Sequence, residues 1–184
     1  MRWVLVMLLM SIVEAGFVAA QPVAAQSPEG AADIKDGNGK RLGRATFSTL
    51  PGGGVWIQAE VAGLTPGVHG IAIHEHGVCQ GPDFASAGGH FNPRGRQHGL
   101  AHREGAHAGD LPNLVADDAG KTRYEAADVR ITLGDGPNSL FKSGGTSLVI
   151  HAAPDDQLTD PDGRAGPGIA CGVISRKGIK EGRS

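Results

Sequence analysis

The sequence has only two cysteines, no excess of charge of either sign and no long apolar run after its first residues. Its 17 Lys and Arg residues nearly balance its 19 Asp and Glu residues, and the formal net charge is −2 at pH 7. A chain without a basic excess lacks the usual footprint of a nucleic-acid or membrane-surface binder. We therefore expect no nucleic-acid partner and, for the mature protein, no membrane partner.

The first 25 residues have the charged, apolar and small-residue order of a secretory signal peptide. Arg2 precedes an apolar run over residues 3–13, and "VAAQPVAAQ" follows soon after. A membrane anchor is the weaker interpretation, because spanning a bilayer takes about 20 apolar residues. The sequence predicts a signal peptide over 1–25, cleaved after Ala20 or Ala25. A single domain over 26–184 would then be periplasmic or secreted.

Both cysteines, Cys79 and Cys171, lie in the part of the chain that would be exported. Export delivers thiols to an oxidising compartment, so one disulfide is the simplest interpretation. The alternative is two buried thiols that never meet.

Short strands are favoured over long helices, because 30 glycines and 11 prolines divide the chain into short pieces. Apolar residues alternate with polar ones from Val55 to Val61 and again from Val129 to Leu133, and "SLVIH" is a third apolar run. A period of two is typical of strands with one buried face. "DGNGK" and "DDAGK" contain the residues that tight hairpin turns require. The sequence predicts an all-β antiparallel sandwich or barrel.

Two segments lack this alternation, residues 77–115 and 152–168, and loops of this length in a compact domain are usually functional. Residues 26–32 and the C-terminal tail are expected to be mobile ends. The first long loop contains a Gly-rich set of four metal-ligand residues: His90, His98, His107 and Asp110. Three imidazoles and a carboxylate form a closed tetrahedral donor set that suits zinc. The alternative is a group of exposed loop histidines.

A second group of histidines surrounds the expected strands. His74 and His76 alternate on one strand and so point to one face, while His151 ends the "SLVIH" run. Imidazole-rich sites without thiolate favour copper or zinc. Ordinary surface or core histidines are the alternative for this group.

Five motifs, in order and in spacing, resemble the copper/zinc superoxide dismutase family: "GLTPGVHG", "SAGGHFNP", "HAGDLPNL", "HAAPDD" and "GIACGVI". The resemblance covers residues 31–175, and it implies an eight-stranded Greek-key barrel. It also implies that Cys79 and Cys171 form the family disulfide, and that Asp155 is a carboxylate linking ligands of the two metals. The zinc ligands it implies are His90, His98, His107 and Asp110, with His90 bridging zinc to copper.

The copper motif of this family reads H-G-F-H-x-H-E-x-x-x-C, and this chain reads "HGIAIHEHGVC" from His69 to Cys79. Ala72 stands where the resemblance implies the first copper histidine. The remaining copper ligands that it implies are His74, His90 and His151.

His76 is an extra histidine relative to the family motif. It could replace the missing ligand, because a strand slip of two residues keeps side chains on the same face. That slip would need a shift of roughly 6.6 Å along the strand. A surface or partner-facing histidine is the simpler interpretation.

The resemblance also implies an arginine over the copper, at the position of Gly168, and Arg164 is the nearby residue that could compensate. Charge focusing changes encounter rates by roughly 10- to 1,000-fold, so this replacement bears on rate more than on fold. The function implied is conversion of superoxide to oxygen and hydrogen peroxide, with His74, His90 and His151 as catalytic residues and with reduced activity. The alternative is a non-catalytic, zinc-stabilised module that binds copper weakly or another ligand such as haem. A homodimer is compatible with the family.

Overall fold

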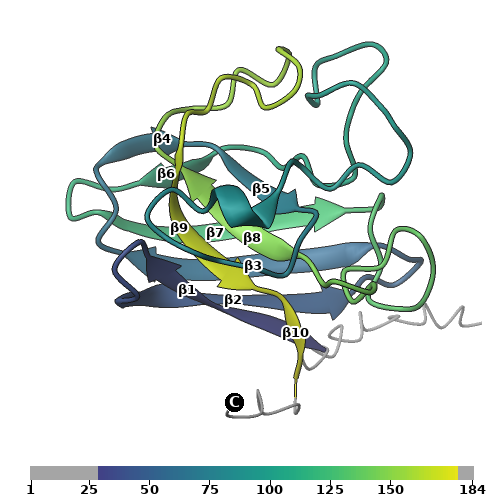
Figure 1. Ribbon diagram of the computed structural model, residues 1–184, viewed down its shortest axis with the longest axis horizontal. Helices are drawn as coiled ribbons and strands as arrows, with labels where there is room; N and C mark the ends of the chain where they lie inside the picture. The colour runs from purple at the N-terminus through teal and green to yellow at the C-terminus, as the bar shows by residue number, and fades with distance from the viewer. Residues whose placement is uncertain (1–28, 178–184) are drawn as a thin grey trace, which may run out of the picture.

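The computed structural model describes residues 29–177, which form a curled antiparallel sheet with long loops at one end (Figure 1). The predicted signal peptide lies outside the described residues. Among the residues described, no helix is long and apolar enough to cross a membrane. The elements are β1 (Gly30–Asp36), β2 (Arg41–Thr49), β3 (Val55–Ala62), β4 (Gly67–His69), β5 (Ile71–His74), the 3-10 helix η1 (Ala85–Ala87), β6 (Leu114–Ala116), β7 (Lys121–Asp128), β8 (Ser147–His151), β9 (Gly168–Val173) and β10 (Ser175–Arg176).

The main sheet has the order β5-β8-β9-β1-β2-β3-β7, with β10 also paired to β1, and β4 pairs with β6 in a second sheet. Only Gly70 separates β4 from β5, and only Ile174 separates β9 from β10. If each of these two pairs is counted as one interrupted strand, the ten strands become eight. Neighbours that are not consecutive in sequence, such as β1 with β9 and β5 with β8, give the crossovers of a Greek key. The prediction of an all-β, eight-stranded antiparallel fold is confirmed.

Alternation along the central strands fills the interior. In β3 the apolar residues Val55, Ile57, Ala59 and Val61 are buried, while the residues between them are partly or fully exposed. The strand predicted over this segment is confirmed. The "SLVIH" run is β8, and hairpin turns begin at Asp36 and Asp117, as "DGNGK" and "DDAGK" predict.

Strands β5 and β8 differ from the others because every residue in both is buried. Ile71 and Ile73 of β5 join the core on one face, together with Leu148 and Ile150 of β8. The residues between them face the other way, where the long loops cover the sheet. Burial on both faces explains why neither strand shows a simple apolar and polar alternation.

Two sequence expectations are wrong. Residues 129–133 are not a strand: β7 ends at Asp128, and Val129 is 79% exposed although Ile131 and Leu133 are buried. Arg130 causes the bend, because its backbone N–H and its guanidinium both donate to the Asp128 carboxylate. Residues 26–32 are not wholly a mobile end either, since β1 begins at Gly30 and pairs with β2.

The two segments predicted to be functional loops, residues 77–115 and 152–168, correspond in the structure to the connection 75–113, between β5 and β6, and the connection 152–167, between β8 and β9. Both project from the same end of the barrel, at the top of Figure 1. They are hydrogen-bonded to each other: the backbone N–H of Ala101 donates to Gln157 O, and that of His98 donates to the Asp160 carboxylate. The two loops together form one cover over the β5–β8 face.

Candidate metal centre

The free edge of β5 holds the first long loop against the barrel. Isolated antiparallel bridges join Ala72 to Asp110 and His74 to His90. Between these bridges, the N–H of Ile73 donates to Gly109 O at 2.9 Å. The backbone of this edge therefore places two loop residues from the predicted zinc set directly beside the strand that carries His74.

A disulfide joins the same loop to the last strand of the barrel. Cys79 and Cys171 are bonded, with Cα atoms 5.7 Å apart and a separation of 92 positions in sequence. The disulfide packs with Phe84, Ala87 and Val149 in a small apolar cluster. The predicted disulfide is confirmed, and it fixes the loop next to the second histidine group.

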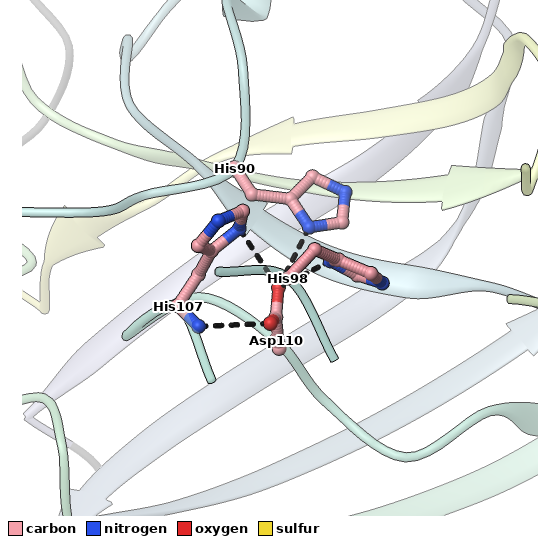
Figure 2. Close-up of side chains that lie close together, drawn as sticks. All are labelled: His90, His98, His107 and Asp110. Carbon is pink, nitrogen blue, oxygen red and sulfur yellow. Dashed lines mark hydrogen bonds and ion pairs between the residues drawn. The ribbon is translucent and has the colours of Figure 1, made fainter. Parts of the chain in front are cut away.

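The first cluster converges on one carboxylate oxygen. Asp110 Oδ1 lies 2.8 Å from Nδ1 of His90, 3.1 Å from Nδ1 of His98 and 3.3 Å from Nδ1 of His107. Figure 2 shows the three rings gathered around this carboxylate. All four residues are buried, and their candidate ligand atoms lie within 4.8 Å of one another. The sequence therefore identified four residues that the fold does bring together.

Backbone and side-chain donors fix the orientation of Asp110. Its Oδ2 accepts the N–H of Gly99 at 2.7 Å and the N–H of His107 at 2.9 Å. Its main-chain carbonyl accepts Nη2 of Arg130 at 2.5 Å, while the same guanidinium binds the buried Asp128 carboxylate. Hydrogen bonds to the carboxylate outweigh its burial and hold the pKa of Asp110 well below its ordinary value. Sequence reasoning missed Arg130, because nothing in the chain near it indicates a contact with Asp110.

Asp155 supports the cluster from the second loop. Its Oδ1 accepts Nε2 of His98 at 2.9 Å, so that ring lies between two carboxylates. Burial opposes protonation of His98, but the hydrogen bonds that its ring donates to Asp110 and Asp155 prevail and raise the pKa of His98 to about 10. The backbone N–H of Asp155 donates to the Asn113 side chain, and the backbone C=O of Asp155 accepts from it, so Asn113 fixes Asp155 in turn.

The second cluster consists of His74, His90 and His151, all buried, with candidate ligand atoms again within 4.8 Å of one another. Nδ1 of His74 lies 2.8 Å from Gly88 O, and Nδ1 of His151 lies 2.8 Å from Gly166 O. A carbonyl oxygen can only accept, so each Nδ1 carries the proton and each neutral ring presents a lone pair at Nε2. These two Nε2 atoms are 3.1 Å apart.

The environment of this cluster favours neutral rings. Burial, assisted by the nearby His90, lowers the pKa of His74 to about 3. Burial is also the main reason that the pKa of His151 is lowered. Neutral imidazoles with convergent lone pairs are suited to bind a metal cation.

The donor sets of the two clusters fit different metals. Three Nδ1 atoms and a carboxylate match the tetrahedral nitrogen and oxygen sites that zinc prefers. Three Nε2 atoms without thiolate match copper or zinc. The Nε2 of His90 and the Nδ1 of His107 are buried without a hydrogen-bond partner among residues 29–177, and each belongs to one of these sets. Unpartnered buried nitrogens in a native fold are costly unless a ligand such as a metal satisfies them.

His76 and Ala72 belong to neither histidine cluster, but they occupy different places. His76 follows the end of β5, its side chain is 53% exposed, and its nearest ionic neighbour is Glu75 at 3.6 Å. It belongs to neither histidine cluster in the described chain. Ala72 is a buried residue of β5 that pairs with Val149 of β8, and it lies on the same face of the strand as His74.

A pocket of about 490 Å³ opens above the second cluster and is lined by His74, His90 and His151. Gly168 lines it, as does Arg96, which the sequence did not single out. Arg164, the residue expected to compensate for Gly168, does not line this pocket. A larger groove of about 890 Å³ lies beside the disulfide, but neither histidine cluster lines it.

The two histidine clusters share the ring of His90, and both lie where the long loops cover the antiparallel barrel. The protein is therefore a β-barrel protein with a candidate metal centre. The model of the family described as copper/zinc superoxide dismutase (SODC) matches residues 42–174. The chain belongs to the copper/zinc superoxide dismutase family.

Two curated relatives are superoxide dismutases [Cu-Zn]. One from Aquifex aeolicus is 48% identical over 145 residues, covering 78% of this chain and 85% of the relative. One from Caulobacter vibrioides is 41% identical over 144 residues, covering 77% and 82%. The crystal structure of a SOD-like protein from Bacillus subtilis superposes with a TM-score of 0.75 at 34% identity, covering 78% of this chain and 96% of that one.

Proposed function

We propose that this chain is an exported superoxide dismutase that holds one zinc and one copper ion and works at a reduced rate. The observation that carries the proposal is the position of His90. Its Nδ1 faces Asp110 in the first cluster, and its Nε2 is a buried atom of the second cluster that has no hydrogen-bond partner in the described part of the chain. A single imidazole with one nitrogen in each donor set can couple the two metal positions.

The zinc ion is assigned to Nδ1 of His90, His98 and His107 and to a carboxylate oxygen of Asp110. The set is closed, since four protein ligands complete the tetrahedral coordination of a structural zinc. Asp155 would fix the ring of His98 through its Nε2, as partners of metal-bound histidines commonly do. The main role of zinc would be to order the first loop and to orient His90.

The copper ion is assigned to Nε2 of His74, His90 and His151. Bound copper would supply the one-electron redox chemistry that zinc lacks. Two superoxide ions and two protons then give one dioxygen and one hydrogen peroxide, so one superoxide is oxidised and the other is reduced. Within the chain, Nε2 of His90 is the atom that would take up and release a proton in each cycle, because the opposite nitrogen is held beside Asp110.

Two residues account for the reduced rate. Ala72 supplies no imidazole, so three ring nitrogens remain for copper. Gly168 supplies no positive charge at the pocket, and Arg164 lies outside the pocket lining. Loss of focusing charge lowers the encounter rate with an anion, typically by one order of magnitude or more.

Export is part of the proposal. The disulfide between Cys79 and Cys171 fits an oxidising compartment, which agrees with a signal peptide over residues 1–25 and with a periplasmic or secreted location.

The test is metal analysis of protein purified without added metal, followed by a superoxide assay after loading with zinc and then with copper. The proposal expects one zinc and one copper per chain and catalytic activity that depends on copper. Stoichiometric copper without any superoxide turnover would support the non-catalytic module instead. Absence of copper binding would refute the assignment of His74, His90 and His151.

A further inference from the structure

The pocket above the second histidine cluster has an acidic mouth. Three aspartates line it, Asp83, Asp160 and Asp162, and the one Arg or Lys residue in its lining is Arg96. The carboxylates and the guanidinium of these four residues, three negative charges and one positive charge, sum to a net charge of −2. Gly168 also lines this pocket, and it stands at the position where the family resemblance implies an arginine.

The carboxylates of Asp83 and Asp162 are held in place by the backbone of their own loops. Asp83 accepts the N–H of Ala85 through Oδ1 at 3.1 Å, and Asp162 accepts the N–H of Arg164 at 3.1 Å. Each uses one carboxylate oxygen in this way and has no cationic side-chain partner among the described residues. Asp160 Oδ1 accepts the N–H of His98 and lies 3.6 Å from Nε2 of His107, and the Asp160 side chain remains 46% exposed.

A second, independent observation concerns the nitrogen atoms at the floor of this pocket, which are suited to a cation. The Nε2 of His90 is buried and has no hydrogen-bond partner within residues 29–177, and His90 lines the pocket together with His74 and His151. The Nδ1 protons of His74 and His151 are committed to backbone carbonyls, so their Nε2 lone pairs also point to this space. Acidic walls above a floor of lone pairs attract a positive ion and repel an anion.

We propose that the mouth formed by Asp83, Asp160 and Asp162 guides copper ions to the three histidines and disfavours the entry of superoxide. The inference rests on the proposed function in that the three histidines bind copper. It goes further by assigning the charge selectivity of the pocket to residues outside the ligand set. The chain is then better suited to collecting copper than to attracting its anionic substrate.

The experiment uses zinc-loaded, copper-free protein mixed with Cu²⁺ in a stopped-flow spectrometer, with copper binding followed by visible absorbance. Guidance by a negative mouth predicts that the uptake rate falls several-fold as ionic strength rises from about 10 mM to about 0.15 M, because the screening length shortens from about 30 Å to about 8 Å. The double variant Asp83→Asn/Asp162→Asn should lose most of this salt dependence and bind copper several-fold more slowly at low salt. Each asparagine keeps an oxygen for the backbone N–H.

A variant of opposite sign sharpens the test. Arg96→Gln removes the one positive charge of the mouth and should accelerate copper uptake at low salt. Asp118→Asn is the matched control, because Asp118 is exposed in the β6–β7 turn and lines no part of this pocket. That substitution should leave the uptake rate unchanged.

Superoxide provides the second readout. On the copper-loaded protein, the rate of reaction with superoxide should rise with ionic strength, and Asp83→Asn/Asp162→Asn should raise it at low salt. If the protein binds copper, but the uptake rate changes neither with ionic strength nor in the charge variants, this inference is wrong and the proposed function still stands. Failure to bind copper under any condition would instead refute the proposed function.

Discussion

Ala72 and Asp110 are partners in an isolated antiparallel bridge, so the residue at which the family resemblance implies a copper histidine adjoins the backbone of the carboxylate proposed as a zinc ligand. Gly70, Ala72 and His74 share one face of the β4–β5 segment, while Ile71 and Ile73 enter the core. Asp155 packs against Gly70 on that face. An imidazole at residue 72 would therefore stand between His74 and Asp155.

Ala72→His should complete a four-imidazole copper site. Copper affinity should rise by about tenfold or more, equivalent to about 1.4 kcal/mol, and superoxide turnover should rise with it. Overpacking of a buried site could cost about 1–3 kcal/mol of stability, so thermal unfolding should be followed beside metal binding. Ala72→Gln, which adds bulk without an imidazole, is the control. Equal copper affinity in the histidine, glutamine and parent proteins would contradict the assignment of residue 72.

Gly168→Arg is a less decisive test of the missing charge. A Cβ at residue 168 would lie 2.8 Å from the carbonyl oxygen of Asp83, so the loop would have to move. Asp162→Asn changes the charge of the same pocket without this steric conflict at residue 168.

His76→Ala should leave copper affinity and superoxide turnover unchanged within about twofold. The side chain is 53% exposed and belongs to neither histidine cluster, so no ligand atom is lost. Copper titration of the variant beside His151→Ala, which removes an assigned ligand, gives the comparison. Loss of copper binding in both variants would show that the end of β5 rearranges when copper binds.

Asp110→Ala should abolish stoichiometric zinc binding and lower thermal stability. The substitution removes a ligand and leaves Nδ1 of three buried histidines facing a space without a carboxylate. A ligand that binds only the folded state stabilises it by about 2.7 kcal/mol at 100 times its Kd, and the variant would lose this contribution. Zinc content by mass spectrometry and melting temperature with and without zinc are the measurements. Full zinc occupancy in Asp110→Ala would refute the zinc site.

The part of the site that could be predicted consists of residues whose types and spacing in the sequence indicate metal ligands. His90, His98, His107 and Asp110 lie within one Gly-rich loop and match the family motifs, so their grouping followed from the sequence. Strands β3 and β8 followed from their patterns of apolar residues, although β8 turned out to be buried on both faces.

The part of the site that could not be predicted depends on contacts between loops that are distant in sequence. Arg130 breaks the alternation expected up to Leu133 because its hydrogen bonds with Asp128 and Asp110 outweigh strand continuation. Arg96 lines the copper-side pocket and Arg164 does not, although Arg164 is nearer to Gly168 in sequence. Periodicity reports burial along an element, but it contains no information about contacts between distant loops.

Loss of the disulfide should destabilise the fold strongly. The bond between Cys79 and Cys171 spans 92 residues, and chain entropy predicts a stabilisation of about 4–5 kcal/mol for a loop of that length. Chemical denaturation of Cys79→Ser/Cys171→Ser beside the oxidised parent, both loaded with zinc, measures the difference. A loss below about 1 kcal/mol would mean that the metal and the core hold the loop without the bond.

Arg130 should control how long zinc stays bound, although it is no metal ligand. Its guanidinium joins the buried Asp128 carboxylate to the carbonyl of Asp110, which fixes the backbone beneath a zinc-side ligand. Arg130→Lys keeps a positive charge near Asp128, but an ammonium lacks the planar fork that contacts both partners. Zinc release to a chelator should therefore accelerate by about tenfold or more, in the range seen when partners of metal ligands are removed.

A purely structural role would give a different result. Arg130→Lys would then lower the stability of the metal-free protein and leave the zinc release rate unchanged. Arg123→Lys is the matched control, because Arg123 is exposed and lies 3.6 Å from its partner Glu125 on the surface of β7. Its substitution should alter neither quantity. Faster zinc release in Arg130→Lys, with metal-free stability close to that of the parent, would identify Arg130 as a positioning residue for Asp110.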